Sequence, residues 1–377
     1  MKIIYCIAGT CNSGGMERVL ANKTNFWVRN GMEVVIITTD QRGRKPFFPL
    51  PPHVKLVDLD INYEENNDKG FFNKLVHYPY KQWKHKKKLT CLLKSLRADV
   101  VVSMFCNDVS FIWKIKDGSK KVLEIHFSRF KRLQYNRKGI WRLADRFRNR
   151  MDQSLVRRYD RFVVLTHEDK TYWEDLQNMT VIPNARTFNP AAVAQLDNKK
   201  AIAIGRYNYQ KGFDDLIKAW AIVHRSCPDW ELTIVGEGEL SDRLQQLIDD
   251  HNLQACVRLQ PPTSPIEEVY AQASILVMSS RYEGLPMVLL EAQAFGLPVV
   301  SLNCKCGPKD IITDGKDGFL VPEKDINALA GRIILLTDDS ELRKKMGQAA
   351  KLNSERFSEP VIMQQWMELF HSLTWKQ

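Results

Sequence analysis

Short apolar runs alternate with helix-forming segments along this chain, in two separate series. In the first series the predicted strands are Ile3–Ile7, Val34–Thr38, Val54–Leu59, Val100–Met104, Val122–Ile125 and Arg161–Leu165. In the second they are Ala201–Ile204, Leu232–Val235, Val257–Leu259, Ser274–Ser280 and Val299–Leu302. Strands that alternate with helices indicate parallel sheets with helices on both faces. A chain of 377 residues is too long for one ordinary core, so the pattern predicts two doubly wound α/β domains.

The expected domains are residues 1–184 and 185–360, followed by a helix over residues 361–377. A polar, alanine-rich stretch up to Lys200 is expected to be a linker. The final helix carries apolar residues at helical spacing, namely Ile362, Trp366, Leu369, Phe370 and Leu373. This stripe fits a helix that packs on its own domain as well as one that crosses back to the first domain.

A strand–loop–helix junction in the second series carries two glutamates. The segment reads Arg281-Tyr-Glu-Gly-Leu-Pro-Met-Val-Leu-Leu-Glu291. Ligands of such α/β units lie at the carboxyl ends of the strands. Pro286 suits the first position of a helix and is counted with the binding loop. We therefore expect Glu283 in the loop and Glu291 about one turn inside the helix.

The backbone at the start of this helix is expected to bind a phosphate. The amides of Gly284, Leu285 and Met287 would face the ligand, and the helix dipole favours an anion there. Carboxylates are unfavourable beside an anion, so Glu283 and Glu291 are expected to accept hydrogen bonds from hydroxyls on either side of the phosphate. A sugar nucleotide carries hydroxyls in both places.

This pair of glutamates, separated by seven residues, resembles the motif of the retaining glycosyltransferases of family 4. That family has the GT-B fold, in which two Rossmann-like domains face a central cleft. The resemblance covers nearly the whole chain and is strongest from Val181 to Pro322. It implies that Glu283 contacts the donor sugar and that Glu291 holds the nucleotide ribose. The alternative is a solvated loop glutamate and a surface helix glutamate.

Two cations follow the first strand of the second series. Arg206 and Lys211 lie in the segment that begins at Gly205 and ends at Gly212. Cleavage between an anomeric carbon and a nucleoside diphosphate develops negative charge on the leaving oxygen, which fixed cations stabilise without a metal ion. The resemblance implies this catalytic role, with Gly205 among the donor contacts. We accordingly expect no cofactor and no metal site.

Other positions in the first domain gain a role mainly from the resemblance. Gly14 and Gly15 resemble the glycine-rich loop of the family, which approaches the donor phosphates, although an ordinary turn before a helix fits as well. His126 follows a predicted strand at a position where the family has a histidine beside the transferred sugar, whereas a lone histidine fits a structural role equally. Asp58-Leu59-Asp60 looks like a metal-binding motif of other glycosyltransferases but is expected to cap its strand.

The strand ends of the second domain provide further donor contacts. Gly236 lets the backbone approach a nucleotide, and Leu259 and Gln260 lie where the family reads the base through backbone groups. The segment Cys306-Gly-Pro-Lys-Asp-Ile-Ile312 is reminiscent of members that assemble bacterial surface polysaccharides and lipid-linked oligosaccharides from UDP-sugars. This favours a UDP-sugar donor, although the segment also fits a simple helix start at Pro308.

The net charge of +11 is unevenly distributed. Residues 1–185 contain 34 Lys and Arg against 19 Asp and Glu, and the remainder contains 21 against 25. From Phe127 to Arg150 nine basic residues accompany one acid. Arg142, Arg146 and Arg150 are expected to meet anionic lipid headgroups or a polyprenyl diphosphate acceptor, and Lys81 to Lys88 with Trp83 extend this surface. A merely solvated basic face is the alternative.

The chain shows no apolar run of about 18 residues and no signal peptide before its first strand. Its eight cysteines lack zinc-ligand spacing and are expected to be reduced thiols. These features favour a cytoplasmic protein that is peripheral on the inner face of the membrane.

Together these patterns predict a retaining glycosyltransferase that moves a sugar from a UDP-sugar to a lipid-linked (polyprenyl diphosphate) or other glycan acceptor. Two alternatives stay open. One is a nucleotide-sugar epimerase, which shares the fold, and the other is a nucleic-acid-binding protein that uses the basic half. The second lacks any recognised module and leaves the glutamate pair unexplained, so no nucleic-acid partner is expected.

Overall fold

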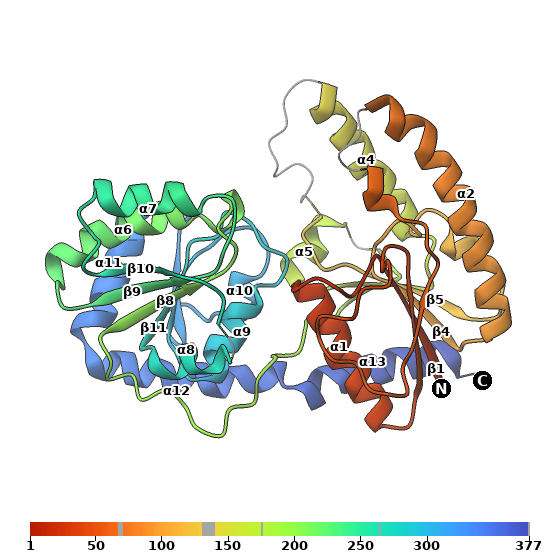
Figure 1. The fold of residues 1–377 in the computed structure, drawn as a ribbon. Helices are drawn as coiled ribbons and strands as arrows, with labels where there is room; N and C mark the ends of the chain where they lie inside the picture. Colours follow the sequence, from red (N-terminus) through yellow and green to blue (C-terminus); the bar gives the residue numbers. More distant parts are fainter. Residues whose placement is uncertain (67–70, 130–139, 175, 264, 376–377) are drawn as a thin grey trace. The chain divides into compact units, whose positions relative to one another are not determined.

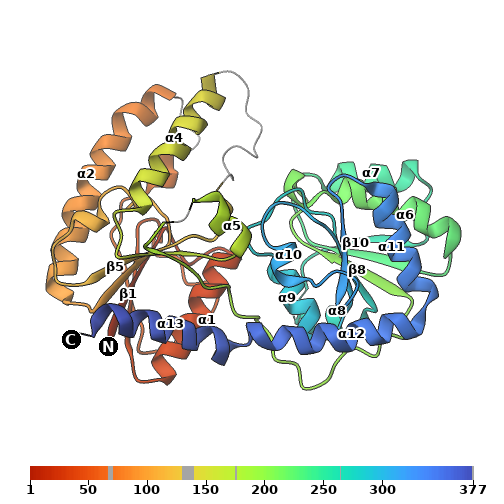
Figure 2. The ribbon, with the colours of Figure 1, turned by 180° about the vertical axis from the view of Figure 1, so that it is seen from behind.

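The computed structural model describes residues 1–66, 71–129, 140–174, 176–263 and 265–375, which form two compact units. Unit 1 comprises Met1–Leu165, Lys170–Ile182 and Met363–Gln377. Unit 2 comprises Thr166–Asp169 and Pro183–Ile362. Each unit has its own sheet with helices on both faces (Figures 1 and 2).

Unit 1 contains a seven-stranded sheet in the order β3-β2-β1-β4-β5-β6-β7, with parallel pairing throughout. Its strands are β1 (Lys2–Ile7), β2 (Glu33–Thr38), β3 (Lys55–Asp58), β4 (Val100–Ser103), β5 (Lys120–Glu124), β6 (Arg161–Val164) and β7 (Met179–Val181). In the centre of the sheet, Ile4 of β1 lies opposite Val35 and Val101. Crossover connections of this kind bury the central strands on both sides.

The helices of unit 1 cover the two faces of this sheet. They are α1 (Gly15–Arg29), α2 (Phe71–Leu96), α4 (Ile140–Val156), the second half of α5 (His167–Tyr172) and α13 (Glu359–Thr374) from Met363 onward, with short 3₁₀ turns η1 (Tyr63–Asn66) and η2 (Ile112–Lys114); the first half of α5 belongs to unit 2. Leu89 of α2 and Val156 of α4 share a buried cluster with Ile4 of β1. The neighbouring Tyr5 points to the opposite face, where its hydroxyl accepts a hydrogen bond of 2.9 Å from Trp27 of α1.

Helix α13 packs against α1, as both views show (Figures 1 and 2). The ring centroids of Trp27 and Phe370 are 5.5 Å apart, and Lys23 Nζ lies 3.7 Å from the centre of the Trp366 ring. Trp366 and Phe370 are fully buried. The last helix is therefore part of the core on the α1 side of unit 1.

Unit 2 contains a six-stranded sheet in the order β10-β9-β8-β11-β12-β13, again parallel. Its strands are β8 (Lys200–Ile204), β9 (Glu231–Val235), β10 (Val257–Gln260), β11 (Ile275–Met278), β12 (Val299–Leu302) and β13 (Gly318–Val321). Its helices are α6 (Phe213–Ser226), α7 (Ser241–Asp250), α8 (Glu267–Gln272), α9 (Met287–Ala294), α10 (Pro308–Ile311), α11 (Ile326–Asp338) and α12 (Ser340–Ser354), with turns η3 (Tyr209–Lys211) and η4 (Glu355–Phe357). The fully buried Trp220 of α6 and Ile333 of α11 pack in the same cluster as Ala201 of β8.

Most predicted strands differ from the structure by one or two residues at an end, and strands β7 and β13 were not among the predicted ones. Two further differences concern the loops of the predicted site. Strand β11 is shorter than expected because Ser279 leaves the ladder and its hydroxyl donates a 2.9 Å hydrogen bond to the carbonyl of Lys211. Helix α9 begins at Met287, one residue later than predicted. Pro286 caps it with an extended backbone, at ψ 103°.

The stretch expected to be a linker is packed onto unit 2. The Arg186 guanidinium contacts the Glu355 carboxylate at 2.9 Å, and Ala194 and Leu196 are buried. The composition of residues 185–200 is polar, but a few apolar and charged side chains suffice to hold the segment in place. Within the described residues, no helix has both the length and the apolar character needed to cross a membrane.

Candidate functional site

The loops at the carboxyl edge of the unit 2 sheet bring two of the predicted site residues into contact. Lys211, in the turn after β8, places Nζ 2.8 Å from Oε1 of Glu283, in the loop after β11. Gln210 approaches the other carboxylate oxygen at 3.4 Å. Glu283 is only 8% exposed, and a carboxylate so buried requires such a partner.

Two glycines and a serine explain how Lys211 reaches this position. A Cβ at Gly205 would lie 2.8 Å from Cε of Lys211, so the lysine stem can rest on the strand end only because residue 205 is glycine. Gly212 has φ +62°, and a Cβ there would lie 2.3 Å from the carbonyl oxygen of Ser279. The two loops therefore touch through backbone where any side chain would keep them apart.

The other predicted cation, Arg206, is exposed, and its side chain makes no hydrogen bond or ion pair with the part of the chain that the structure describes. Arg281 behaves differently. It contacts Asp214 at 2.8 Å and Asp215 at 2.6 Å, and its guanidinium lies 4.3 Å from the centre of the Tyr209 ring. The charge of Arg281 is thus neutralised within unit 2.

Glu291 lies inside α9 and is 7% exposed. The hydroxyl of Tyr270, in α8, donates a 2.6 Å hydrogen bond to Oε2 of Glu291. Sequence reasoning missed Tyr270. Tyr270 lies 21 residues before Glu291, and no motif in the sequence links the two. The two glutamates of the motif are accordingly both buried carboxylates at the same sheet edge.

The start of α9 carries backbone amides available for a ligand. Pro286, before the first turn, supplies no side-chain cap. The amides of Gly284, Leu285 and Met287 donate no hydrogen bond to any residue within the described ranges. The loop after β12 packs closely here, since a Cβ at Gly307 would lie 2.3 Å from Cδ of Pro286.

The remaining predicted donor contacts have packing roles of their own. A Cβ at Gly236 would lie 1.9 Å from the carbonyl oxygen of Gly205, so glycine is required there by the contact between two loops. The carbonyl of Gln260 accepts from the amide of Gly236 at 2.8 Å and from the hydroxyl of Tyr207 at 3.1 Å. Leu259 packs against the core of unit 2.

The segment at residues 306–312 starts a helix, as one of its two interpretations predicted. Pro308 is the first residue of α10, and Asp310 accepts hydrogen bonds from the amides of His167 at 2.7 Å and Glu168 at 3.3 Å. The amide of Cys306 in turn donates to the Glu168 carboxylate at 2.9 Å. This segment thus fixes the first turn of α5.

In unit 1, His126 belongs to a buried ionic cluster with Glu124 and Lys23. Nε2 of His126 lies 3.2 Å from Oε1 of Glu124, which also binds the Lys23 ammonium of α1. Burial acts to raise the pKa of Glu124, but the charges of Lys23 and His126 outweigh it and lower that pKa to about 2. Burial lowers the pKa of Lys23 despite the charge of Glu124. A fully buried carboxylate thus holds His126 next to the end of β5.

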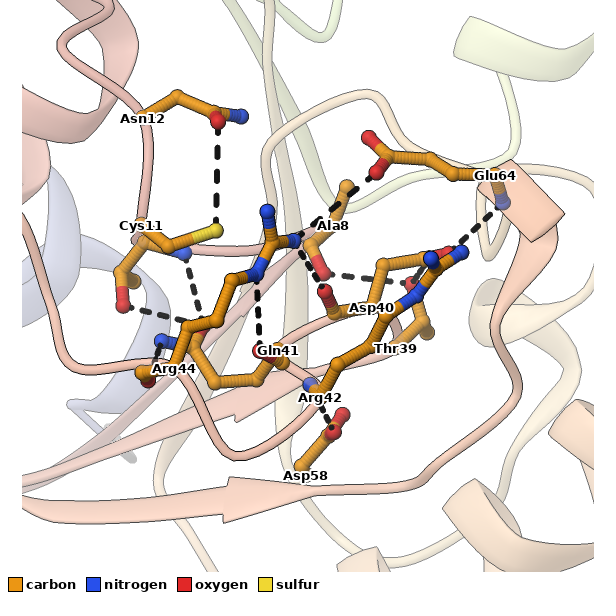
Figure 3. Close-up of polar contacts among 11 residues, drawn as sticks. Ala8, Cys11, Asn12, Thr39, Asp40, Gln41, Arg42, Arg44, Asp58 and Glu64 are labelled. Carbon is orange, nitrogen blue, oxygen red and sulfur yellow. Dashed lines mark hydrogen bonds and ion pairs between the residues drawn. The ribbon is translucent and has the colours of Figure 1, made fainter. Parts of the chain in front are cut away.

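The glycine loop after β1 is tied to the loop after β2. Gln41 is central to this link, because Oε1 accepts from the amide of Thr10 at 2.9 Å while Nε2 donates to the carbonyl of Arg44 at 2.7 Å (Figure 3). Gly14 precedes α1 as its cap, and Gly15 is its first residue. A Cβ at Gly14 would lie 2.2 Å from a carboxylate oxygen of Glu17, so the first turn of the helix folds back over this glycine.

Asp58 supports the same loops. Its carboxylate accepts from the amide of Arg42 at 3.1 Å, as drawn in Figure 3, and from the amide of Asp60 at 3.3 Å. The two aspartates of this motif thus form a local turn, in agreement with the capping role expected from the sequence. Among the described residues there is no group of three or more His, Cys, Asp or Glu side chains that could hold a metal ion.

Arg142, Arg146 and Arg150 all lie in α4. The side chain of Arg150 is exposed, whereas those of Arg142 and Arg146 lie outside the described part of the structure.

The chain forms two doubly wound units with parallel sheets, and the predicted binding residues of unit 2 lie at its strand ends. This arrangement defines a protein of the GT-B class. Residues 186–353 match the family model described as Glycosyl transferases group 1, and residues 13–186 match Glycosyltransferase Family 4. An uncharacterized glycosyltransferase of Haemophilus influenzae is 31% identical over 376 residues, which cover 97% of this chain and 98% of the relative. The chain belongs to the group 1 and family 4 glycosyltransferases.

One further relative and one solved structure are similar over nearly the whole chain. One is the Campylobacter jejuni GalNAc-alpha-(1->4)-GalNAc-alpha-(1->3)-diNAcBac-PP-undecaprenol alpha-1,4-N-acetyl-D-galactosaminyltransferase, 28% identical with 98% of both chains covered. The other is the crystal structure of a mutant of Staphylococcus aureus TarM in complex with Fondaparinux, alpha-GlcNAc-glycerol and UDP. It has a TM-score of 0.77 at 17% identity, covering 98% of this chain and 99% of that one. The second likeness shows the fold alone.

The buried ionic cluster of unit 1 yields a stability prediction. Lys23→Met leaves Glu124 charged and buried without its lysine partner, which should lower the free energy of unfolding by about 3–5 kcal/mol. The double variant Lys23→Met/Glu124→Gln should recover a large part of that loss, since no unpaired charge remains. Urea unfolding of both variants measures this.

The matched control is Lys120→Met, which removes a half-exposed lysine 4.0 Å from Asp160 in the same sheet. It should cost no more than about 1 kcal/mol. If Lys23→Met were no more destabilising than Lys120→Met, the buried cluster would contribute nothing to the stability of unit 1.

Proposed function

We propose that this glycosyltransferase moves a sugar, with retention of the anomeric configuration, from a UDP-sugar to a lipid-linked or other glycan acceptor in surface-glycan biosynthesis. The observation that carries the proposal is the carboxyl edge of the unit 2 sheet. There the buried Glu283 with its partly buried partner Lys211, the buried Glu291 and the amides at the start of α9 lie on adjoining loops and helices.

Each group suits one part of a sugar nucleotide. The amides of Gly284, Leu285 and Met287 bind the diphosphate, where the helix dipole stabilises negative charge. Glu291 accepts hydrogen bonds from the ribose hydroxyls, on one side of the phosphates. Glu283, oriented by Lys211, accepts from a hydroxyl of the donor sugar.

The reaction breaks the bond between the anomeric carbon and the β-phosphate oxygen of UDP. Arg206 and Lys211 stabilise the charge that develops on this oxygen, so the leaving group needs no metal ion or other cofactor. The acceptor hydroxyl attacks the anomeric carbon from the face that the phosphate leaves, and its proton passes to the departing phosphate. His126 borders the transferred sugar, held by Glu124.

The nature of the substrates is supported by the relatives and by charge. The name of the Campylobacter relative specifies an acceptor glycan on PP-undecaprenol, and the TarM structure contains UDP. Residues 1–185 carry a large excess of basic side chains, which suits a diphosphate-linked lipid and an anionic membrane surface. Arg142, Arg146 and Arg150 are assigned to that surface, on the inner, cytoplasmic face of the membrane.

Incubation with a panel of nucleotide sugars tests the proposal. Without acceptor, we expect slow release of UDP from one or a few UDP-sugars, no release from GDP- or ADP-sugars, and no effect of EDTA. Exclusive use of another nucleotide would contradict the donor assignment, and conversion of the UDP-sugar to its epimer would indicate an epimerase. If EDTA abolished release and Mg²⁺ or Mn²⁺ restored it, the two cations would not suffice for the leaving group.

Glu291→Ala should weaken UDP binding about 10- to 100-fold, because a hydrogen bond to a charged acceptor contributes about 1.5–3 kcal/mol. Isothermal titration calorimetry with UDP measures the change. The control is Glu268→Ala, which removes an exposed glutamate from the neighbouring α8. Unchanged affinity in Glu291→Ala would remove the ribose assignment.

A further inference from the structure

Helix α2 presents aromatic and basic side chains to solvent on one face. Tyr80 is 61% exposed and Trp83 is 59% exposed, and their rings are stacked with centroids 6.2 Å apart. Lys87 places Nζ 5.4 Å from the centre of the Trp83 ring. We use the name α2 outer face for the side chains on this stripe, which recur at three- and four-residue spacing: Tyr80, Trp83, Lys87, Cys91 and Lys94.

The opposite side of the helix is anchored in the core of unit 1. His85, Leu89 and Leu93 are 2%, 0% and 0% exposed. The orientation of α2 about its axis is therefore fixed, and the exposure of Tyr80 and Trp83 is a stable property of the fold. Large aromatic side chains that remain in water on a fixed helix face mark an interaction site.

The lysines of α2 fall into two groups. Lys84 and Lys88 donate to the carbonyls of Asp60 at 3.1 Å and Leu59 at 2.6 Å, and Lys81 donates to the carbonyl of Asn62, so these three hold the segment that follows β3. The second group is Lys86, Lys87 and Lys94, all exposed. No member of this group forms a hydrogen bond or ion pair with the residues that the structure describes. The contact recorded for this group is that of Lys87 with the Trp83 ring, which lies within the α2 outer face itself.

Stacked Trp and Tyr rings beside free lysines match the chemistry of a bilayer interface. Trp and Tyr rings favour the level of the lipid headgroups. Lysine ammonium groups reach the anionic phosphates while their stems lie on the apolar surface. A stable attachment takes both the aromatic insertion and the electrostatic attraction. From Tyr80 to Lys94 the helix is about 21 Å long. Single-stranded nucleic acid instead needs open aromatic platforms in a groove, whereas these two rings stack on each other.

We propose that the α2 outer face, together with Lys86, docks the protein on an anionic lipid bilayer. This deepens the proposed function, because a lipid-linked acceptor is reached only at a membrane. The attachment is electrostatic and interfacial, with Trp83 and Tyr80 at the headgroup level and the three free lysines on anionic phosphates.

Vesicle flotation tests the proposal. The full chain should float with phosphatidylcholine vesicles that contain phosphatidylglycerol, should not float with pure phosphatidylcholine, and should be released by high salt. The triple variant Lys86→Glu/Lys87→Glu/Lys94→Glu should bind at least a hundredfold more weakly. Tyr80→Ser/Trp83→Ser should bind roughly tenfold more weakly, with the remaining attachment more sensitive to salt.

The matched control is Arg243→Glu/Lys316→Glu/Lys345→Glu, which makes the same change in net charge at exposed positions of unit 2. It should bind vesicles like the unchanged protein. Equal losses in both triple variants would show a general charge effect and overturn the proposal, as would undiminished binding of the α2 variant. Binding to a fluorescent single-stranded oligonucleotide that the α2 variant loses, without binding to vesicles, would assign the face to nucleic acid and also overturn it.

The flotation assay contains no nucleotide and no acceptor, so its result is independent of the proposed reaction. UDP release by the α2 variants should equal that of the unchanged protein, which also reports that they fold. If the unchanged protein released UDP but did not float, the membrane proposal would fail and the proposed reaction would stand. If it floated but released no UDP, the proposed reaction would fail and the membrane proposal would stand.

Discussion

A parallel sheet covered by helices on both faces leaves its strand ends as the places where polar groups from distant parts of the chain can gather. Unit 2 shows the consequence directly. Lys211 and Glu283 are 72 residues apart, yet they meet at 2.8 Å because β8 and β11 are adjacent in the sheet. Tyr270 and Glu291 meet beside the same strands. The pairing of Lys211 with Glu283 depends on this adjacency.

Burying charge at these strand ends carries a free-energy cost that the protein meets by pairing. Glu283 is paired with Lys211, and Glu291 with the hydroxyl of Tyr270. Glu124 in unit 1 is bound by Lys23 and His126. A carboxylate held in this way has a fixed orientation, which suits it to orient hydroxyls of a substrate or a neighbouring imidazole. Arg206 stands apart as an exposed cation, free to bind an anion.

The sequence was sufficient for most of the order of strands and helices, because buried parallel strands have short apolar runs and their helices have a clear apolar stripe, but the short edge strands β7 and β13 were not predicted. A single loop-helix motif also placed Glu283 and Glu291 near the end of β11, where both are buried, and their roles in donor binding stay predictions. The sequence did not predict which residues touch across the fold. The contacts of Glu124 with Lys23 and of Glu291 with Tyr270 join segments whose relation depends on tertiary packing, and nothing local marks them. The packed segment 185–200 was likewise missed, because its few buried side chains lie among polar ones.

The central claim is that the loop before α9 and the first turn of this helix bind the diphosphate of the donor. Hydrogen–deuterium exchange of a peptide covering residues 281–291, with and without UDP, measures this most directly. The account predicts that UDP slows exchange there, because the amides of Gly284, Leu285 and Met287 gain hydrogen-bond partners, while α7 exchanges at the same rate as before. Exchange that is unchanged in residues 281–291 under saturating UDP, with protection elsewhere in the chain, would contradict it.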